Sequence, residues 1–190
     1  IRSREFSMKD AYSFHAGEDD LAITYERVVQ AYMNIFQRCG LPTIAVEADS
    51  GAIGGKDSHE FILPAENGED LILHCTQCGY AANVERATSR LTANPQENEL
   101  PIHDIHTPGV RTIPEVAKYL NVPESKTLKA VFGITNGEII FATIRGDLQV
   151  NEVKLANVLK ARDLRMATDK EIANAGLVAG SASPVGLHGI

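Results

Sequence analysis

The opening residues of the chain carry side chains that suit the binding of a nucleotide. Arg2, Arg4 and Phe6 alternate in the sequence, so on an extended strand they lie on one face. Guanidinium groups bind phosphates in a fork geometry, and an aromatic ring can stack on adenine. An exposed charged strand with one buried phenylalanine has the same spacing, and spacing alone favours that interpretation.

A second group of candidate residues follows a glycine pair. Gly54 and Gly55 allow the backbone to approach a ligand closely. Three polar side chains come next: Ser58, His59 and Glu60. His15 and His59 are candidates for general bases, but histidines at the ends of strands and helices are more often hydrogen-bonding or surface residues. We therefore expect no catalytic proton transfer from them.

Cys75 and Cys78 have the spacing of half a zinc site. No second pair follows, so Cys39 or His74 would have to complete an irregular set of ligands. We expect a structural pair of thiols at this position and no metal site.

The second half of the chain is mildly basic and ends near a loop of small residues, Gly180-Ser-Ala-Ser-Pro184. By composition alone, its basic side chains form a solvated surface: Lys126, Lys129, Arg145 and Lys154.

Composition restricts the possible classes of protein. The chain has 190 residues, is 44% hydrophobic and carries a net charge of -7, so it can bury an ordinary core and is not intrinsically disordered. An acidic chain is unsuited to coating nucleic acid, although one basic face can hold an RNA end. Three cysteines indicate no disulfide framework and a reducing cytosol. We find no signal peptide and no membrane-spanning segment.

Charge also separates two parts of the chain. Residues 1–107 carry 8 basic and 17 acidic side chains, whereas residues 108–190 carry 10 and 8. The polar stretch from Thr88 to Asp104, with its prolines, predicts a linker between two units. The chain opens on Ile1 and closes on a glycine- and proline-containing stretch, so we expect both ends to be cut from a longer protein.

The elements of the first half are predicted to form an antiparallel sheet with one long helix. A short strand is expected at 5–9, and a helix capped by Asp19 or Asp20 should end before Gly40. Further strands are expected at 43–48, 60–63 and 71–74, the last two joined by a turn at Asn67-Gly68.

The second half is predicted to be a small mixed α/β domain. Helices are expected at about 113–120, 151–159 and 169–175, with a further one from about 125. Strands at 130–134 and 139–144 should form a hairpin through Asn136-Gly137, which favours the tight turn that such hairpins use.

Three stretches of the first half resemble bacterial-type prolyl-tRNA synthetases, a family of class II aminoacyl-tRNA synthetases. Residues 2–15, Arg-Ser-Arg-Glu-Phe-Ser-Met-Lys-Asp-Ala-Tyr-Ser-Phe-His, resemble the second half of the family's motif 2, and residues 47–61 and 75–85 are similar in order and spacing. The resemblance implies that Arg2, Arg4 and Phe6 meet ATP and the acceptor end of the tRNA. It also implies an amino-acid pocket formed by five residues: Gly54, Gly55, Ser58, His59 and Glu60.

The second half resembles the inserted editing domain of the same family. The matching stretches are Thr112-Ile113, Lys126-Thr-Leu-Lys129, Arg145-Gly-Asp147, Asn151-Glu-Val-Lys154 and the Gly180 to Pro184 loop. The resemblance implies that Lys129, with Lys126 as a competitor, and Gly180 act in hydrolysis. Ala130 departs from relatives that have a hydroxyl residue there.

The resemblance implies an α+β fold in three parts: part of a class II aminoacylation domain at 1–90, a linker at 91–106 and part of an editing domain at 107–190. The implied activity is ligation of proline to tRNA(Pro) with ATP and Mg²⁺, with hydrolytic editing of Ala-tRNA(Pro), in a cytoplasmic homodimer with no membrane contact. The alternatives are a stand-alone trans-editing deacylase, which would not need residues 1–87, and a nonenzymatic tRNA-binding paralogue. Since motifs 1 and 3 and the first strand of motif 2 are not present, we expect this chain to be poorly active alone.

Overall fold

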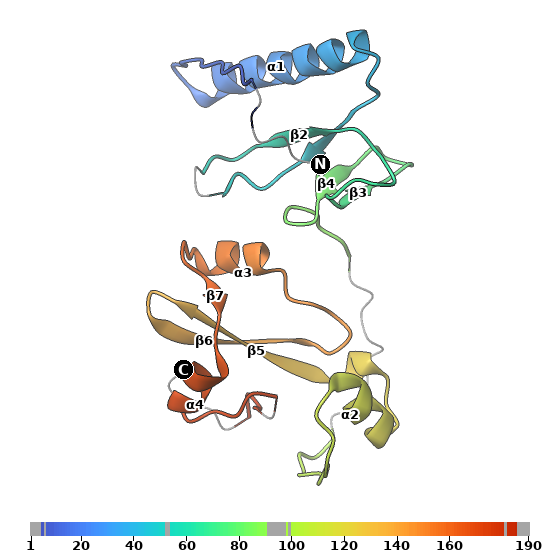
Figure 1. The fold of residues 1–190 in the computed structure, drawn as a ribbon, viewed down its shortest axis with the longest axis vertical. Helices are drawn as coiled ribbons and strands as arrows, with labels where there is room; N and C mark the ends of the chain where they lie inside the picture. Colours follow the sequence, from blue (N-terminus) through green and yellow to red (C-terminus); the bar gives the residue numbers. More distant parts are fainter. Residues whose placement is uncertain are drawn as a thin grey trace. The chain divides into compact units, whose positions relative to one another are not determined.

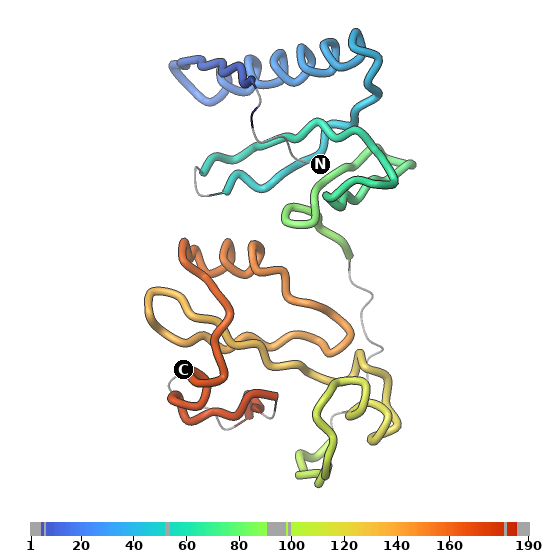
Figure 2. Tube along the Cα trace, in the orientation of Figure 1, coloured from blue at the N-terminus to red at the C-terminus, as the bar shows by residue number. Residues whose placement is uncertain are grey.

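A computed structural model describes residues 5, 7–51, 54–90, 98, 100–180 and 182–185. The chain divides into two compact units, Ile1–Ala87 and Thr88–Ile190, each with its own sheet. Figure 1 shows the helices and strands of both units, and Figure 2 traces the chain through them.

The long helix of the first unit, α1, spans Glu18–Arg38. Gly17 is its N-cap, so the helix begins before the predicted caps Asp19 and Asp20, which lie in its first turn instead. Acidic residues in a first turn interact favourably with the positive end of the helix dipole. The helix ends where Gly40 adopts φ +73°, a conformation that glycine allows without steric cost.

The sheet of the first unit has four short strands in the order β2-β1-β4-β3. They are β1 (Ile44–Glu47), β2 (His59–Ile62), β3 (Ile72–His74) and β4 (Ala81–Asn83). β1 pairs antiparallel with β2 and parallel with β4. The prediction of a wholly antiparallel sheet is therefore wrong at the centre of the sheet.

Three other predictions for this unit differ from the structure. β4 was not expected, because three residues with two alanines give no strand pattern. Residues 7–9 of the predicted strand at 5–9 are not in a strand. The turn at Asn67-Gly68 does not join a hairpin, since β2 pairs with β1 and β3 pairs with β4.

The first unit is held together by a small core and by aromatic contacts. The buried apolar residues are mostly alanines: Val46, Ala48, Ala81, Ala82 and Ala87. α1 packs on β2 through three rings, with Tyr32 and Phe36 lying 5.1 and 5.7 Å from Phe61 between centroids. Such ring pairs contribute stability beyond the area they bury. α1 thus covers the face of β2 on which Phe61 lies (Figure 1).

The second unit contains a three-stranded sheet in the order β6-β5-β7. Its elements are α2 (Ile113–Leu120), the 3-10 turn η2 (Glu124–Lys126), β5 (Leu128–Thr135), β6 (Glu138–Arg145), α3 (Glu152–Leu159), β7 (Arg165–Met166) and α4 (Asp169–Asn174). The predicted helices and both predicted strands are present, except that the element at 124–126 is a single 3-10 turn. The two-residue strand β7 was not predicted.

The hairpin of β5 and β6 turns at the predicted residues. Asn136 and Gly137 have φ +51° and +79°, the left-handed conformations of the tight turn whose twist matches that of paired strands. The register runs from Thr135 opposite Glu138 to Leu128 opposite Arg145. Because the register is fixed, Lys129 lies near the end of β5 remote from the turn.

Packing in the second unit centres on Phe132, which is buried and lies 5.0 Å from Phe141 between ring centroids. Ala117 of α2 and Ile172 of α4 are also buried. Capping boxes begin both helices: Thr112 with Glu115 in α2 and Thr168 with Glu171 in α4. Within the described residues, no helix is long and apolar enough to cross a membrane.

Candidate functional sites

The proposed nucleotide-binding residues lie outside the described part of the chain. Arg2, Arg4 and Phe6 are not among residues 5, 7–51 and 54–87, which are the described residues of the first unit. Their expected roles therefore remain predictions. The described candidates of this unit are the glycine pair, Gly54 and Gly55, and the residues that follow it.

The glycine pair forms the turn that leads into β2. Gly54 and Gly55 have φ +79° and +113°, conformations that L side chains rarely adopt. Ser50 Oγ donates to the carbonyl oxygen of Gly55 at 3.3 Å, and Ala48 N donates to the carbonyl oxygen of Ser58 at 2.9 Å. These bonds hold the turn against the end of β1.

His59 joins the start of β2 to α1. Its Nδ1 is hydrogen-bonded to Tyr25 Oη at 2.9 Å, with the ring centroids 5.7 Å apart. Both side chains line a cavity of about 780 Å³ that also touches Gly55 and the first turns of α1. Burial, followed by the negative charges of Asp57 and Glu26, raises the pKa of Tyr25. Tyr25 thus stays a neutral phenol that can donate a hydrogen bond.

An ion pair lies at the same cavity. Lys56 Nζ is 2.8 Å from Glu18 Oε2, so the loop before β2 is joined to the first turn of α1. The hydrogen bond between the two side chains, followed by the opposite charge of the partner, lowers the pKa of Glu18 and raises the pKa of Lys56. Both side chains are largely exposed, so water and salt screen the pair and its contribution to stability is small.

The proposed amino-acid pocket is divided by the pleat of β2. Side chains alternate between the faces of a strand, and His59 and Phe61 both contact α1. Glu60 therefore lies on the opposite face of β2 from His59. Glu60 is exposed and pairs across the sheet with Val46. Consequently, the cavity beneath α1 contains Gly55 and His59 but not Glu60.

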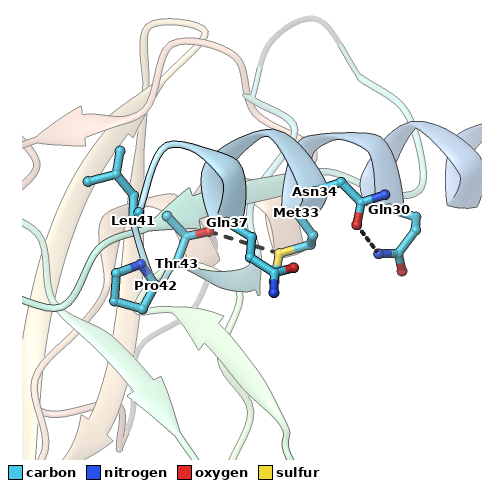
Figure 3. Close-up of a pocket in the computed structure, with 8 residues that line it drawn as sticks. Gln30, Met33, Asn34, Gln37, Leu41, Pro42 and Thr43 are labelled. Carbon is cyan, nitrogen blue, oxygen red and sulfur yellow. Dashed lines mark hydrogen bonds between the residues drawn. The ribbon is translucent and has the colours of Figure 1, made fainter.

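Another pocket, of about 580 Å³, lies at the other end of α1 (Figure 3). Amide groups line one side, where Gln30 Nε2 donates to Asn34 Oδ1 at 3.0 Å. Near Pro42, the hydroxyl of Thr43 lies 4.0 Å from Met33 Sδ. No residue proposed above from the sequence lines this pocket.

The thiols do not belong to a larger ligand set in the described part of the chain. There, no three His, Cys, Asp or Glu side chains gather as metal ligands would. Cys39 and Cys78 are exposed and Cys75 is half-exposed, and all three are free thiols.

Lys129, the editing candidate, is half-buried in β5 and has a defined hydrogen-bond partner. Its Nζ donates to the carbonyl oxygen of Leu148 at 2.7 Å. An ammonium group has three donors, so this bond orients the group and leaves others for a ligand. Lys126, its competitor, is exposed in η2. Lys129 is therefore less exposed than Lys126, and a hydrogen bond orients its ammonium group.

The loop that accepts this bond is itself held by close contacts. Arg145 donates to both carboxylate oxygens of Asp147, at 2.6 and 3.0 Å. Gly146 N donates to the carbonyl oxygen of Thr127 at 2.8 Å. A Cβ on Gly146 would lie only 2.0 Å from Thr127 Oγ1. Sequence reasoning missed the roles of Gly146 and Leu148, since one acts by having no side chain and the other through its backbone.

Gly180 lies in an exposed turn after α4 and has φ +75°. The space around its Cα is open, so its requirement is conformational and not steric. The loop prediction for residue 180 is therefore confirmed, while its role in hydrolysis stays a prediction.

Comparison with known proteins identifies both units. Residues 1–110 match the family described as tRNA synthetase class II core domain (G, H, P, S and T). The chain belongs to this class II synthetase family. Residues 107–190 match the Aminoacyl-tRNA editing domain. The chain therefore joins a class II synthetase core to an editing domain, as its sequence motifs indicate.

The class II chain is also similar along nearly its whole length to proteins named Proline--tRNA ligase. The one from Dehalococcoides mccartyi is 51% identical over 98% of this chain and 33% of its own. Those from a Sulfurihydrogenibium species and Geobacter sulfurreducens are 46% and 43% identical over 99% of this chain and 34% and 33% of theirs. The chain thus spans about a third of the length of these relatives. A crystal structure of a hypothetical protein is 29% identical over 41% of this chain and 53% of its own, with a TM-score of 0.38 that supports no argument about fold.

Proposed function

We propose that the protein containing this chain ligates proline to tRNA(Pro) and hydrolyses Ala-tRNA(Pro) formed in error. The observation that carries the proposal is the presence of a class II core and an editing domain in one chain, together with relatives named Proline--tRNA ligase at up to 51% identity. The parts assigned to each reaction follow the proposed boundaries: aminoacylation at 1–90, a linker at 91–106 and editing at 107–190.

Both activities are expected on physical grounds. Proline and alanine are small and apolar, so a pocket that admits proline excludes alanine only weakly. Differences on the scale of a methylene group change binding by about 1–3 kcal/mol. A second site that hydrolyses the smaller product supplies the missing selectivity.

In aminoacylation, the carboxylate of proline attacks the α-phosphorus of ATP and pyrophosphate leaves. The enzyme mainly positions the two reactants and neutralises charge. We assign Arg2 and Arg4 to the phosphates and acceptor end, and Phe6 to the adenine. These assignments rest on the sequence motif.

For the amino acid, the division of β2 refines the assignment. Exposed Glu60, together with Ser58 just before β2, is proposed to meet proline, whose ammonium group favours a carboxylate partner. Gly54 and Gly55 are proposed to let the backbone before β2 approach the amino acid closely, since both have φ angles that suit glycine. His59 is proposed as a positioning residue, because its bond to Tyr25 fixes the start of the same strand.

Mg²⁺ accompanies ATP in this proposal and is held chiefly by phosphate oxygens, which it prefers together with one or two carboxylates and water. Since the described residues contain no cluster of three candidate ligands, none of them is assigned to the ion. When bound, the ion neutralises phosphate charge.

In editing, water attacks the ester carbonyl of Ala-tRNA(Pro), releasing alanine and free tRNA. Lys129 is proposed to hold the terminal nucleotide or the ester through the donors not used by Leu148. Backbone N–H groups of the loop at Gly180 are proposed to bind the developing oxyanion. The proposed setting is a cytoplasmic homodimer with tRNA(Pro), proline and ATP as partners.

The test is proline-dependent exchange between ATP and pyrophosphate by the full-length protein, with alanine for comparison, followed by deacylation of Ala-tRNA(Pro). Strong exchange with proline, weaker exchange with alanine and hydrolysis of Ala-tRNA(Pro) are expected. Hydrolysis without exchange would identify a trans-editing deacylase instead. Binding of tRNA without either reaction would identify a nonenzymatic paralogue.

A further inference from the structure

The cysteine pair lies in a tight turn between β3 and β4, separate from the sites proposed above. Cys75 N donates to the carbonyl oxygen of Tyr80 at 2.7 Å, and Gly79 N donates to the carbonyl oxygen of Cys75 at 2.9 Å. Gly79 has φ +76°, a conformation that lets the chain turn back toward β4. Both ends of the turn are therefore fixed by paired strands.

This turn brings the two thiols together. Residues i and i+3 of a tight turn have Cα atoms less than about 7 Å apart, and disulfides join Cα atoms about 4.4–6.8 Å apart. Cys75 and Cys78 are the first and fourth residues of the turn that is closed by the hydrogen bond from Gly79 N to the carbonyl oxygen of Cys75. Both cysteines lie outside the paired residues of β3 and β4, so a disulfide between them would close within the turn.

The backbone of the turn favours the thiolate form of Cys75. The pKa of the Cys75 thiol is lowered. The largest cause is hydrogen bonding to the backbone of Cys78, followed by that of Gln77 and then by the Cys78 thiol. The thiolate is the reactive form of cysteine, and exposure decides whether an oxidant reaches it. Cys75 is half-exposed and Cys78 exposed. Cys75 is therefore suited to react first and Cys78 to react with its product.

We propose that Cys75 and Cys78 form a redox modification site, closing reversibly to a disulfide within the turn when the protein meets hydrogen peroxide. The Cys75 thiolate attacks one peroxide oxygen, the O–O bond breaks, and a sulfenic acid and hydroxide form. Cys78 then attacks the sulfenic sulfur, the S–S bond forms, and water leaves with the Cys78 proton. Both sulfurs are oxidised and the peroxide is reduced to two water molecules. A dithiol reductant reverses the reaction.

The sequence offers a direct measurement. Trypsin cleaves after Lys56 and Arg86, so both thiols fall in the peptide 57–86, whereas Cys39 falls in 39–56. The full-length protein is treated with hydrogen peroxide, blocked with an alkylating agent, digested and weighed by mass spectrometry. The expected peptide 57–86 is lighter by two hydrogen atoms and carries no alkyl group. After reduction, the same peptide takes up two alkyl groups.

Three variants make the test specific. In Cys78→Ser, oxidation should stop at a sulfenic acid on Cys75 that dimedone traps, while in Cys75→Ser the remaining thiol should react at least several-fold more slowly. Cys39→Ser is the matched control and should leave peptide 57–86 unchanged. The proposal is overturned if 57–86 of the wild type keeps two alkylatable thiols, if Cys78 is oxidised before Cys75, or if the bond forms with another cysteine. The wild-type measurement decides even if a variant does not fold.

Discussion

The ammonium group of Lys129 donates a hydrogen bond to the backbone carbonyl oxygen of Leu148 at 2.7 Å. This bond joins the beginning of β5 to the loop after β6. The loop is in turn held by the Arg145–Asp147 ion pair and by the contact of Gly146 with Thr127. The orientation of Lys129 therefore depends on Arg145 at the end of β6 and on Gly146 and Asp147 in the loop.

Lys129→Ala in the full-length protein is expected to slow deacylation of Ala-tRNA(Pro) by about 10²-fold or more, because a fixed cationic donor is lost from the site. Proline-dependent ATP–pyrophosphate exchange should not change. Lys126→Ala, at an exposed position of the same segment, is the matched control and should retain deacylation. The assignment is reversed if the Lys126 variant is the inactive one.

Tyr25→Phe and His59→Phe are each expected to lower the free energy of unfolding of the first unit by about 0.5–1.5 kcal/mol, since each removes the same half-buried hydrogen bond. The double variant should lose less than the sum of the two. Urea denaturation of the 190-residue chain and of its variants measures this coupling. Additive losses would show that the contact makes no energetic contribution.

Glu60→Gln is expected to raise the KM for proline in the exchange reaction while leaving unfolding within about 0.5 kcal/mol of the wild type, because the side chain is exposed. His59→Gln supplies the comparison on the opposite face of β2. A larger change in KM for the His59 variant, without loss of stability, would move the amino-acid site to the cavity beneath α1.

Gly146→Ala should destabilise the second unit by about 1–3 kcal/mol, as overpacking does. The new Cβ would lie 2.7 Å from the carbonyl oxygen of Glu124 and 2.9 Å from Ile113 Cγ2, in addition to its clash with Thr127. Gly17→Ala, where nothing lies within 4 Å of the added carbon, is the control. Thermal or urea unfolding with equal losses for both variants would contradict the packing argument.

Glu171→Gln tests a pH dependence. Hydrogen bonds from Arg165 and then from Thr168 hold the pKa of Glu171 well below its usual range. A depressed folded-state pKa contributes stability above the ordinary glutamate value of about 4.3, and this contribution is lost as the pH falls toward the folded-state pKa. The wild type should therefore exceed the variant in stability at neutral pH by a margin that shrinks in acid.

Urea unfolding at about pH 7 and about pH 3 measures that margin. Glu138→Gln, at an exposed position of β6, is the control and should show a smaller difference between the two conditions. A margin that stays constant with pH would show that Glu171 acts through its shape in the capping box and not through its charge.

The sequence alone determined the elements whose signals are local. Helical spacing of apolar residues predicted α1, helix start and stop signals predicted α2, α3 and α4, and Asn136-Gly137 predicted the β5–β6 hairpin. These features depend on neighbours a few residues apart. Motif order predicted the family for the same reason: the stretches at 2–15, 47–61 and 126–129 can be read without knowing what they contact.

Only the tertiary structure decided what depends on distant partners. β4 and β7 are too short to have a pattern and exist because β1, β3 and β5 pair with them. The pleat of β2 separates His59 from Glu60, although the two are adjacent in the sequence. The hydrogen bond from Lys129 to Leu148 joins residues 19 positions apart through a backbone atom. Such contacts depend on how the chain folds back on itself, which residue types and spacing do not specify.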